Sequence, residues 1–332
     1  MKRPLRIGII GSGRIAAVHA RNIDAHALAT VSAVAGSSAA KARAFIDANQ
    51  LEARAYGAGT ELIEHEALDA VFICLPPFAR TEVFEAAAAS RLAVFIEKPV
   101  ALTFDHAEQM AALARKNRLL TMVGYHYRFA RSVQRLKAAV ESGEAGHPAL
   151  FEGRFLCNDL HAPWWREVRT SGGQTVEQIA HLYDLATHLF GNVTTVSARF
   201  ANLLHRATPG YTIEDNAVAT LAFANGALGS IASSNCAVPG EWSVDWSAVC
   251  KNLTVTAAGT GNSRWTQTNL DPPRREDFND SDDPYVQEVD HFLRCVHENT
   301  PTRCPLEDGL ATLALTLAAV ESASRDGAVI RV

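Results

Sequence analysis

The first 124 residues alternate short apolar runs with amphipathic, alanine-rich segments, and this alternation limits the possible folds more than any other feature. The apolar runs predict strands at 5–10, 30–35, 53–56, 70–75, 92–97 and 120–124. The segments between them predict helices near 14–26, 39–48, 59–65, 79–90 and 104–117. Strands that alternate with helices form parallel crossover units. We therefore expect an α/β domain with a doubly wound parallel sheet and helices on both faces.

The pattern changes after about residue 125, where longer alternating runs replace the crossover units. Helices are predicted near 129–141, 174–190, 285–298 and 306–325, and strands at 148–156, 193–202, 215–224, 228–236, 242–250 and 252–258. Asn225-Gly226 between two alternating runs predicts a hairpin. The polar segment 271–283 is expected to be a solvated loop or a mobile lid.

A chain of 332 residues is longer than a single core usually grows, so we expect two domains. The change of pattern divides the chain into an α/β domain at 1–124 and an α+β domain at 125–332 with an open, mostly antiparallel sheet.

Composition excludes several classes of protein. With 48% hydrophobic residues, 20% charged residues and a net charge of −5, the chain resembles ordinary globular proteins and lacks the basic surface of nucleic-acid binders. The same charge argues against a polybasic membrane anchor, and no apolar run reaches the roughly 20 residues that cross a bilayer. Six scattered cysteines show no metal-binding spacing. We therefore expect a cytoplasmic protein with reduced thiols, no metal site, and no nucleic-acid or membrane partner.

A glycine-rich turn follows the first predicted strand and precedes the first predicted helix, in the order Gly11-Ser12-Gly13-Arg14-Ile15-Ala16. In this position, Gly11 allows a tight turn, Gly13 lets the backbone approach a pyrophosphate, and Ala16 permits close packing of helix on strand. The free N–H groups at the start of the helix would bind the phosphates, with Arg14 and Ile15 in its first turn. We expect a nicotinamide dinucleotide here.

The end of the second predicted strand indicates which dinucleotide is preferred. An acidic residue there would bind both ribose hydroxyls of NAD, but the chain has Gly36 followed by Ser37, Ser38 and Lys41. Two hydroxyls and a lysine suit a 2′-phosphate, so the sequence favours NADP over NAD. The alternative is that the serines only cap the next helix.

The fifth predicted strand ends in Glu97-Lys98-Pro99. Ligands of open parallel sheets bind at the carboxyl ends of the strands, so Lys98 is expected at the nicotinamide. Pro99 would fix the backbone, and a cis Lys98–Pro99 bond is one way to do so. A solvated surface turn is the alternative.

Glu177, His181 and Asp184 in the second half are spaced to share one face of a helix. A carboxylate one turn from a histidine can orient the imidazole for general base catalysis. Apolar residues between them indicate that the helix is partly buried, although a polar helix face in solvent remains the alternative.

Taken together, Gly11–Ala16, Glu97-Lys98-Pro99, Gly124-Tyr125 with Arg128, and the segment 172–184 resemble the glucose–fructose oxidoreductase/inositol dehydrogenase (Gfo/Idh/MocA) family. The resemblance covers the whole chain. It implies a Rossmann domain followed by an α+β domain whose open sheet forms homodimers or homotetramers. It also implies oxidation or reduction of sugars, polyols or related compounds with NAD or NADP.

The resemblance assigns roles to individual residues. Lys98 matches the catalytic lysine, His181 the catalytic histidine, and Glu177 stands where an aspartate is usual. Ile179 replaces a common glycine, and Arg80 stands where a histidine is usual. The residues expected to bind the cofactor are Gly11, Gly13, Arg14, Ile15, Ser37, Ser38, Lys41, Pro76, Glu97 and Lys98. Those expected to contact the substrate are Tyr125, Trp165, Arg166 and Asp184.

The expected activity is hydride transfer between nicotinamide and a secondary hydroxyl or carbonyl group of a sugar or polyol. His181 would exchange the hydroxyl proton, assisted by Lys98 and positioned by Glu177. Two alternatives are a hydrolase that uses bound NAD as a transient oxidant and a non-catalytic regulator that binds NAD(P).

Overall fold

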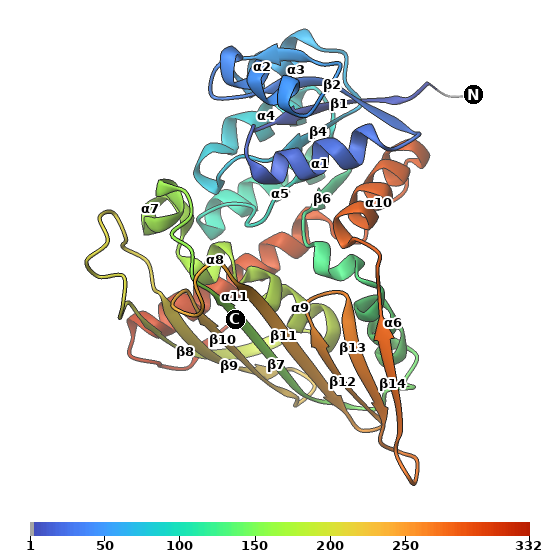
Figure 1. Cartoon of the computed structure of the whole chain (residues 1–332), viewed down its shortest axis with the longest axis vertical. Helices are drawn as coiled ribbons and strands as arrows, with labels where there is room; N and C mark the ends of the chain where they lie inside the picture. The colour runs from blue at the N-terminus through green and yellow to red at the C-terminus, as the bar shows by residue number, and fades with distance from the viewer. Residues whose placement is uncertain (1–2) are drawn as a thin grey trace. The chain divides into compact units, whose positions relative to one another are not determined.

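The computed structural model describes residues 3–332. The chain divides into two compact units, and each is described by itself below. The first contains the residues up to His126 together with Tyr285–Ala311, and the second contains Tyr127–Pro284 together with Thr312–Val332. Most of the helices and strands of both units are labelled in Figure 1.

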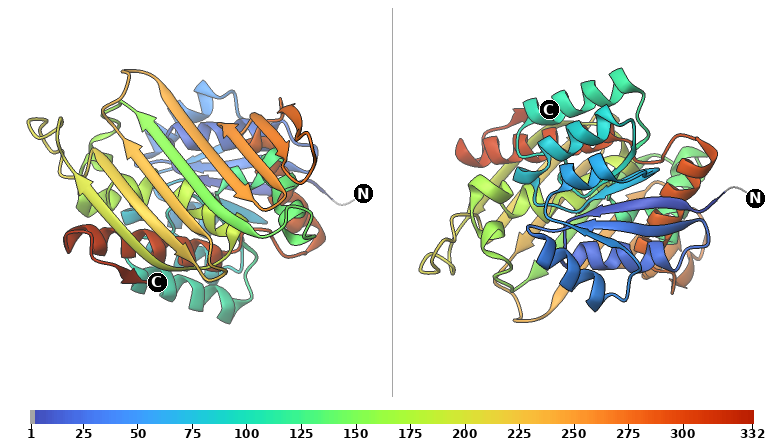
Figure 2. Two further views of the ribbon diagram at one scale, coloured as in Figure 1. Left: turned by 90° about the horizontal axis from the view of Figure 1, so that it is seen from below. Right: turned by 90° about the horizontal axis from the view of Figure 1, so that it is seen from above.

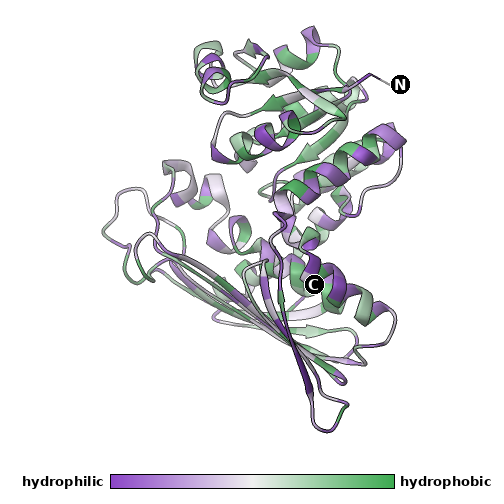
Figure 3. Ribbon diagram, turned by 45° about the vertical axis from the view of Figure 1, so that its right-hand side comes forward, coloured by the Kyte–Doolittle hydropathy of each residue, from purple (hydrophilic) through white to green (hydrophobic). Residues whose placement is uncertain are grey.

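The first unit contains a six-stranded parallel sheet in the order β3-β2-β1-β4-β5-β6. Its strands are β1 (Leu5–Ile10), β2 (Ala29–Ala35), β3 (Arg54–Tyr56), β4 (Ala70–Ile73), β5 (Ala93–Ile96) and β6 (Thr121–Val123). This order confirms the predicted doubly wound sheet, in which the strand order reverses between β1 and β4. Figure 3 shows its strands mostly green, as expected for a sheet buried on both faces.

Five helices connect these strands, namely α1 (Arg14–Asp24), α2 (Ala39–Ala48), α3 (Gly59–His65), α4 (Thr81–Ala89) and α5 (Phe104–Asn117), with a short 3₁₀ turn η1 (Pro77–Ala79) before α4. Figure 2 shows α1 and α5 on opposite faces of the sheet. Side chains cap two of the helices: the Ser38 hydroxyl accepts from the Lys41 N–H, and the Thr103 hydroxyl accepts from the His106 N–H.

Helix α10 (Pro284–Glu298) belongs to the first unit, although it is far from that unit in sequence. Phe292 packs edge-to-face on Phe72 of β4 and Phe95 of β5, with ring centroids 5.3 and 5.6 Å apart. The predicted division at 124/125 is therefore corrected. Residues 285–311 belong to the first unit, because α10 covers apolar side chains of its sheet.

The second unit is built on a nine-stranded sheet in the order β14-β13-β12-β11-β7-β10-β9-β8-β15. Its strands are β7 (Pro148–Cys157), β8 (Val193–Ala201), β9 (Asn216–Phe223), β10 (Leu228–Ser234), β11 (Trp242–Cys250), β12 (Leu253–Ala258), β13 (Asn262–Gln267), β14 (Arg274–Asn279) and β15 (Ile330–Arg331). The pairs are antiparallel except for β7 with β10, which agrees with the predicted mostly antiparallel sheet.

The helical segments that lie wholly or partly in the second unit are η2 (His126–Phe129), α6 (Arg131–Glu141), η3 (Pro163–Arg166), α7 (Val168–Ser171), α8 (Gln174–Glu177), α9 (Ala180–Phe190) and α11 (Leu306–Ser324). Apolar residues of α6, α9 and α11 pack with the inward side chains of the sheet in one core. Figure 2 shows the other face of the sheet without helices over it. Among residues 3–332, no helix has the length and apolar character needed to cross a bilayer.

The segment 271–283 contains the edge strand β14, which corrects the prediction of a loop or lid. The pattern of alternation misses this strand because five of its six residues are exposed and four of them are charged. Cross-strand pairing with β13 includes an ion pair between Arg264 and Asp277 at 2.7 Å. Charged edge strands of this kind discourage pairing with other sheets.

His126 provides a test of how the fold responds to pH. Burial, together with the nearby charge of Lys98, lowers the pKa of His126 from 6.5 to about 3, and its ring stacks on Tyr285 at 4.0 Å. The unfolded chain therefore binds a proton that the folded chain does not, so stability is complete above pH 6.5 and falls as the pH decreases toward 3. We expect a loss of about 2 kcal/mol from this group by pH ~5, measured by urea unfolding.

His126→Phe, which keeps an aromatic ring on Tyr285, is the matched variant for this measurement. Its stability should depend less on pH over the same range than that of the parent. His188 in the second unit, whose burial also lowers its pKa to about 3, should maintain part of the pH dependence in both proteins. Equal pH dependence in parent and variant would contradict this account of His126.

Candidate functional site

The glycine-rich turn between β1 and α1 has the backbone geometry that the sequence predicts. Gly11 has φ +122°, and a Cβ there would lie 2.6 Å from the carbonyl oxygen of Cys74 on the neighbouring strand segment. At Gly13, which caps α1, a Cβ would meet no atom within 4 Å, so this face of the turn is open. Gly13 has no side chain that could cap the first turn of α1. This turn can therefore accept a phosphate group.

Ser38 lies in the turn between β2 and α2. Its hydroxyl accepts from the Lys41 backbone N–H at 3.2 Å, so Ser38 caps α2, which is the alternative that the sequence left open. Ser37 and the Lys41 side chain are exposed. A Cβ on Gly36 would lie 3.0 Å from the Ala42 nitrogen and 3.2 Å from the Ser38 oxygen, so this position suits glycine.

The turn after β5 is held by a buried carboxylate. Glu97 hydrogen-bonds to His19 Nε2 at 2.7 Å through one oxygen and accepts from the Lys98 backbone N–H at 3.2 Å through the other. Gly124 leaves room for it, because a Cβ there would lie 3.1 Å from the Glu97 carboxylate. The Lys98–Pro99 peptide bond is cis, as anticipated, and the Lys98 side chain is half-buried.

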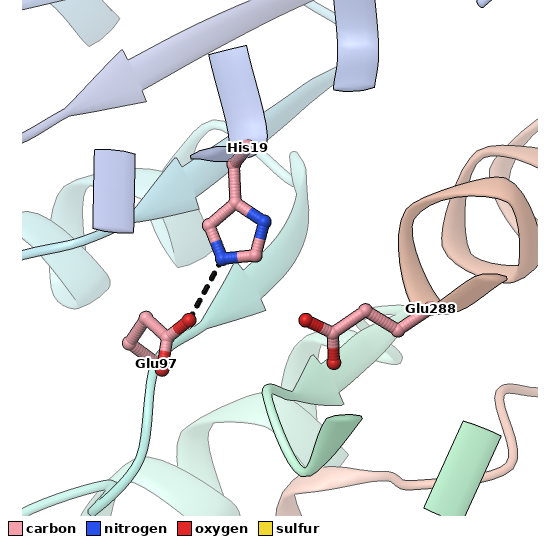
Figure 4. A group of neighbouring side chains, drawn as sticks. All are labelled: His19, Glu97 and Glu288. Carbon is pink, nitrogen blue, oxygen red and sulfur yellow. Dashed lines mark hydrogen bonds and ion pairs between the residues drawn. The ribbon is translucent and has the colours of Figure 1, made fainter. Parts of the chain in front are cut away.

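Glu288 of α10 completes a group of three with His19 and Glu97. Figure 4 shows the three side chains directed toward one another, and their ligand atoms lie within 4.8 Å of each other. Such a group can hold a cation in other proteins. Here, His19 and Glu97 bond directly to each other, so we interpret the group as a buried polar cluster. Burial and the charge of Glu97, with that of Glu288, raise the pKa of the neighbouring Cys74 thiol, which makes this thiol unreactive.

Arg80 lies on the opposite side of the same turn. Its side chain is buried, and it donates to the carbonyl oxygen of Leu75 at 2.7 Å. It also donates to the carbonyl oxygens of Glu97, Lys98 and Pro99. Arg80 is the residue that stands where the resemblance leads us to expect a histidine. In the structure, it holds the main chain around Lys98.

The predicted helix at 174–190 is interrupted after its first turn, so Glu177 ends α8 whereas His181 and Asp184 lie in α9. Glu177 accepts a hydrogen bond from the indole N–H of Trp165 at 2.8 Å. Gly173 before α8 has φ +102°, and a Cβ there would lie 2.6 Å from a carboxylate oxygen of Glu214. The predicted single helical face therefore applies to His181 and Asp184 but not to Glu177.

His181 lies near the start of α9 and is 8% exposed. Its ring stacks on Tyr127, with centroids 5.1 Å apart and planes at 19°. Burial raises the pKa of the Tyr127 hydroxyl, so this group stays protonated near neutral pH. Stacking on a neutral ring fixes the plane of the imidazole.

Asp184 is fully buried, which corrects its predicted role in substrate contact. One oxygen accepts from Arg128 Nε at 2.9 Å, and the other accepts from a terminal nitrogen of Arg128 at 2.6 Å and from the Thr312 hydroxyl at 3.2 Å. A bidentate pair with a further hydrogen bond is the arrangement that compensates the desolvation of two buried charges. Asp184 therefore supports α9 from within the second unit.

The structure also places the other residues that were predicted to contact the substrate. Trp165 is buried in a small cluster with Tyr211 and Ile213. Arg166 donates to the carbonyl oxygens of Leu160 and His161 at 2.6 and 2.9 Å, so its guanidinium supports the main chain of this loop. Tyr125 is 1% exposed in the first unit. None of these positions by itself identifies a substrate contact.

Sequence reasoning missed His19 and Glu214. His19 lies on the buried face of α1 with Ala16, Ala20 and Ile23. A histidine among the apolar residues on the buried face of a predicted helix indicates that a polar group elsewhere in the core bonds to it. Burial raises the pKa of Glu214, which accepts from the Thr175 backbone N–H at 2.7 Å. No sequence signal links Glu214 to α8, because the two are far apart in the chain.

Comparisons with known proteins agree with this arrangement. The family model described as "Oxidoreductase family, NAD-binding Rossmann fold" matches residues 5–125, and the "GFO/IDH/MocA C-terminal domain" matches residues 133–261. The chain is 30% identical over 329 residues to the uncharacterized oxidoreductase YrbE of Bacillus subtilis (strain 168), with 97% of this chain and 95% of the relative covered. It is also 30% identical over 331 residues to myo-inositol 2-dehydrogenase of Thermotoga maritima, with 96% of each chain covered.

A solved structure of levoglucosan dehydrogenase, in complex with NADH and L-sorbose, has the same fold. It superposes with a TM-score of 0.92 at 18% identity and covers 100% of this chain and 99% of that one. The two family models, the full-length relatives at 30% identity and the glycine-rich turn before α1 lead to one conclusion. The chain belongs to the Gfo/Idh/MocA family of NAD-binding oxidoreductases.

Proposed function

We propose that this oxidoreductase transfers hydride between a nicotinamide dinucleotide and a secondary hydroxyl or carbonyl group of a cyclic polyol or sugar. The observation that carries this proposal is the anchored Lys98 turn at the carboxyl end of β5, within the same unit as the open glycine-rich turn of β1. Crevices at this end of a doubly wound sheet bind nucleotides. The name of the Thermotoga maritima relative, myo-inositol 2-dehydrogenase, supports the substrate class.

The residues of the first unit fit a dinucleotide. Gly11 and Gly13 would hold its pyrophosphate at the start of α1, with Arg14 and Ile15 following in the helix. Ser37 and Lys41 are exposed at the end of β2, where the adenosine ribose would bind. Pro76, Glu97 and Lys98 would line the nicotinamide side. When bound, the nicotinamide supplies or accepts hydride at its C4 atom.

Side chains of this protein would remove or return the proton of the reacting hydroxyl group. We propose His181 as the general base, because stacking on Tyr127 fixes the plane of its ring. Lys98 would donate a hydrogen bond to the same hydroxyl. The break after α8 separates Glu177 from the helix that carries His181. Glu177 would therefore act through Trp165, whose indole N–H donates to its carboxylate.

A substrate screen tests the reaction class directly. The purified protein is incubated with inositols, other polyols and aldoses in the presence of NAD⁺ or NADP⁺, and NAD(P)H formation is followed by absorbance. Net reduction of cofactor with at least one cyclic polyol or sugar supports the proposal. Bond cleavage without net cofactor reduction would indicate the hydrolase, and tight cofactor binding without either reaction would indicate the regulator.

Lys98→Met retains most of the aliphatic stem but removes the ammonium group. We expect turnover to fall roughly 10²–10⁴-fold, the usual effect of a positioned acid–base group, while NADH binding by fluorescence changes little. His181→Asn should behave similarly, and Glu177→Gln, which can still accept from Trp165, should be milder. Lys116→Met, on the exposed side of α5, is the matched control. Turnover of Lys98→Met within about threefold of the parent would reject the assignment.

We propose NADP as the preferred cofactor, because residues 36–42 contain no carboxylate to repel a 2′-phosphate. Ser37→Asp places such a carboxylate on an exposed position and avoids the crowding around Gly36. We expect kcat/KM for NADP⁺ to fall at least tenfold relative to that for NAD⁺. Ser37→Asn is the uncharged control. A parent enzyme that strongly prefers NAD⁺ would overturn the NADP assignment at once.

We also propose that the uncovered face of the nine-stranded sheet binds a second copy of the chain, giving a homodimer or homotetramer. This face forms a shallow hollow of about 900 Å³ that includes Ala232 and Ala258. Val218 and Leu228 add exposed apolar surface, at 56% and 59% exposure. Arg154 and Asp245 pair across neighbouring strands of this face. A cytoplasmic location, by contrast, stays a prediction from the sequence.

Sedimentation should therefore give two or four times the chain mass of 35.8 kDa. Ala232→Arg, which adds a long charged side chain to this face, should shift the protein toward the monomer because a like charge would meet it across a two-fold interface. Ala112→Arg on the exposed side of α5 is the matched control. A monomeric parent at micromolar concentration would contradict the proposal.

A further inference from the structure

Arg80 joins two segments of the first unit that are close to the expected cofactor. It follows the 3₁₀ turn η1, which comes after β4, and its Nε donates to the carbonyl oxygen of Leu75 at 2.7 Å. Its terminal nitrogens donate to the carbonyl oxygens of Glu97, Lys98 and Pro99 after β5. A single side chain thus connects the ends of two neighbouring parallel strands.

The guanidinium is suited to this task for geometric reasons. It is planar and has five N–H donors in a fixed fork, so it can satisfy several carbonyl oxygens at once. A lysine ammonium has three donors on a single nitrogen and cannot reach both sides in the same way. Arg80 is only 3% exposed. If its side chain is replaced, the carbonyl oxygens that accept from it lose a hydrogen-bond donor at a site that is shielded from water.

Lys98 is the residue whose position depends most on these contacts. Its own carbonyl and those on both sides of it accept from Arg80, and its N–H donates to Glu97, which is bonded in turn to His19 of α1. The backbone of Lys98 is thereby fixed from two directions. His19 fixes it to the helix that begins at the glycine-rich turn, and Arg80 fixes it to the segment after β4.

We propose that Arg80 is a positioning residue that sets the place of Lys98 and links it to the cofactor-binding segment after β4. This inference rests on the proposed function, because it requires Lys98 to act on the reacting hydroxyl. Arg80 does not itself touch substrate in this account. It acts through the main chain of Lys98.

The test uses Arg80→Lys, which keeps the charge, and Arg80→Met, which removes it. We expect kcat to fall about tenfold in the first and about a hundredfold in the second, with the dissociation constant for NADH within about threefold of the parent. Glu66→Gln is the matched control: Glu66 is also a buried partner of arginines in this unit, but it bonds to Arg6, Arg54 and Tyr56 and not to the Lys98 turn. It should lower thermal stability without lowering kcat.

A double-mutant cycle with Lys98→Met separates positioning from general support. If Arg80 acts through Lys98, Arg80→Lys should cost less than about twofold in the Lys98→Met background, because the group that it positions is already gone. An equal loss in both backgrounds would overturn the inference. So would a kcat of Arg80→Met within twofold of the parent in a folded protein.

The outcomes for the Lys98 and Arg80 variants distinguish a failure of the proposed function from a failure of this inference. If Lys98→Met retains turnover, the proposed function fails, whereas loss of turnover in Lys98→Met with normal Arg80 variants rejects only the inference. Should Arg80→Met fail to fold, Arg80→Lys carries the test. Methylguanidinium added to Arg80→Ala should restore at least a few-fold of kcat, and the absence of any rescue in folded protein would count against a positioning role.

Discussion

The six-stranded parallel sheet must be covered on both faces, and the path of the whole chain follows from this requirement. Strands β4 and β5 have the same sequence, Ala-Val-Phe-Ile, and every residue in both is buried. His19 of α1 contacts the rings of Phe72 and Phe95, and Phe292 of α10 packs on both rings as well. The chain therefore returns to the first unit after forming most of the second, since exposing these rings would cost several kcal/mol.

The same burial determines how the chemistry-bearing residues are held. A polar turn that follows a buried strand has main-chain groups that water cannot satisfy, so they need protein partners. At the end of β5, Glu97 accepts the N–H of Lys98 and Arg80 satisfies the carbonyl oxygens. The side chain of Lys98 can then remain half-buried on a backbone that is fixed on both sides. Such preorganisation favours positioned proton transfer.

The sequence predicts those features that depend on local spacing. The parallel strands, the glycine-rich turn at Gly11 and Gly13, and the location of Lys98 after β5 all follow from alternation and motif order. Prediction fails where a partner comes from far along the chain. The assignment of helix α10 to the first unit is one example, because it depends on Phe292 meeting a distant sheet. The edge strand β14 is missed for another reason, since its sequence has no apolar alternation. Likewise, Ser38 has two compatible roles, and its bond to the Lys41 N–H shows the capping role.

The polar residues around α9 show why helical spacing alone does not assign roles. Asp184 follows His181 by nearly one turn, yet its carboxylate is buried and paired with Arg128. Arg128 directly follows Tyr127 in the chain, so this ion pair fixes η2 beside α9. Tyr127 is thereby positioned for its ring to stack on His181. Asp184, which spacing places on the same helix face as His181, thus orients the imidazole only indirectly, through Arg128 and the adjacent Tyr127.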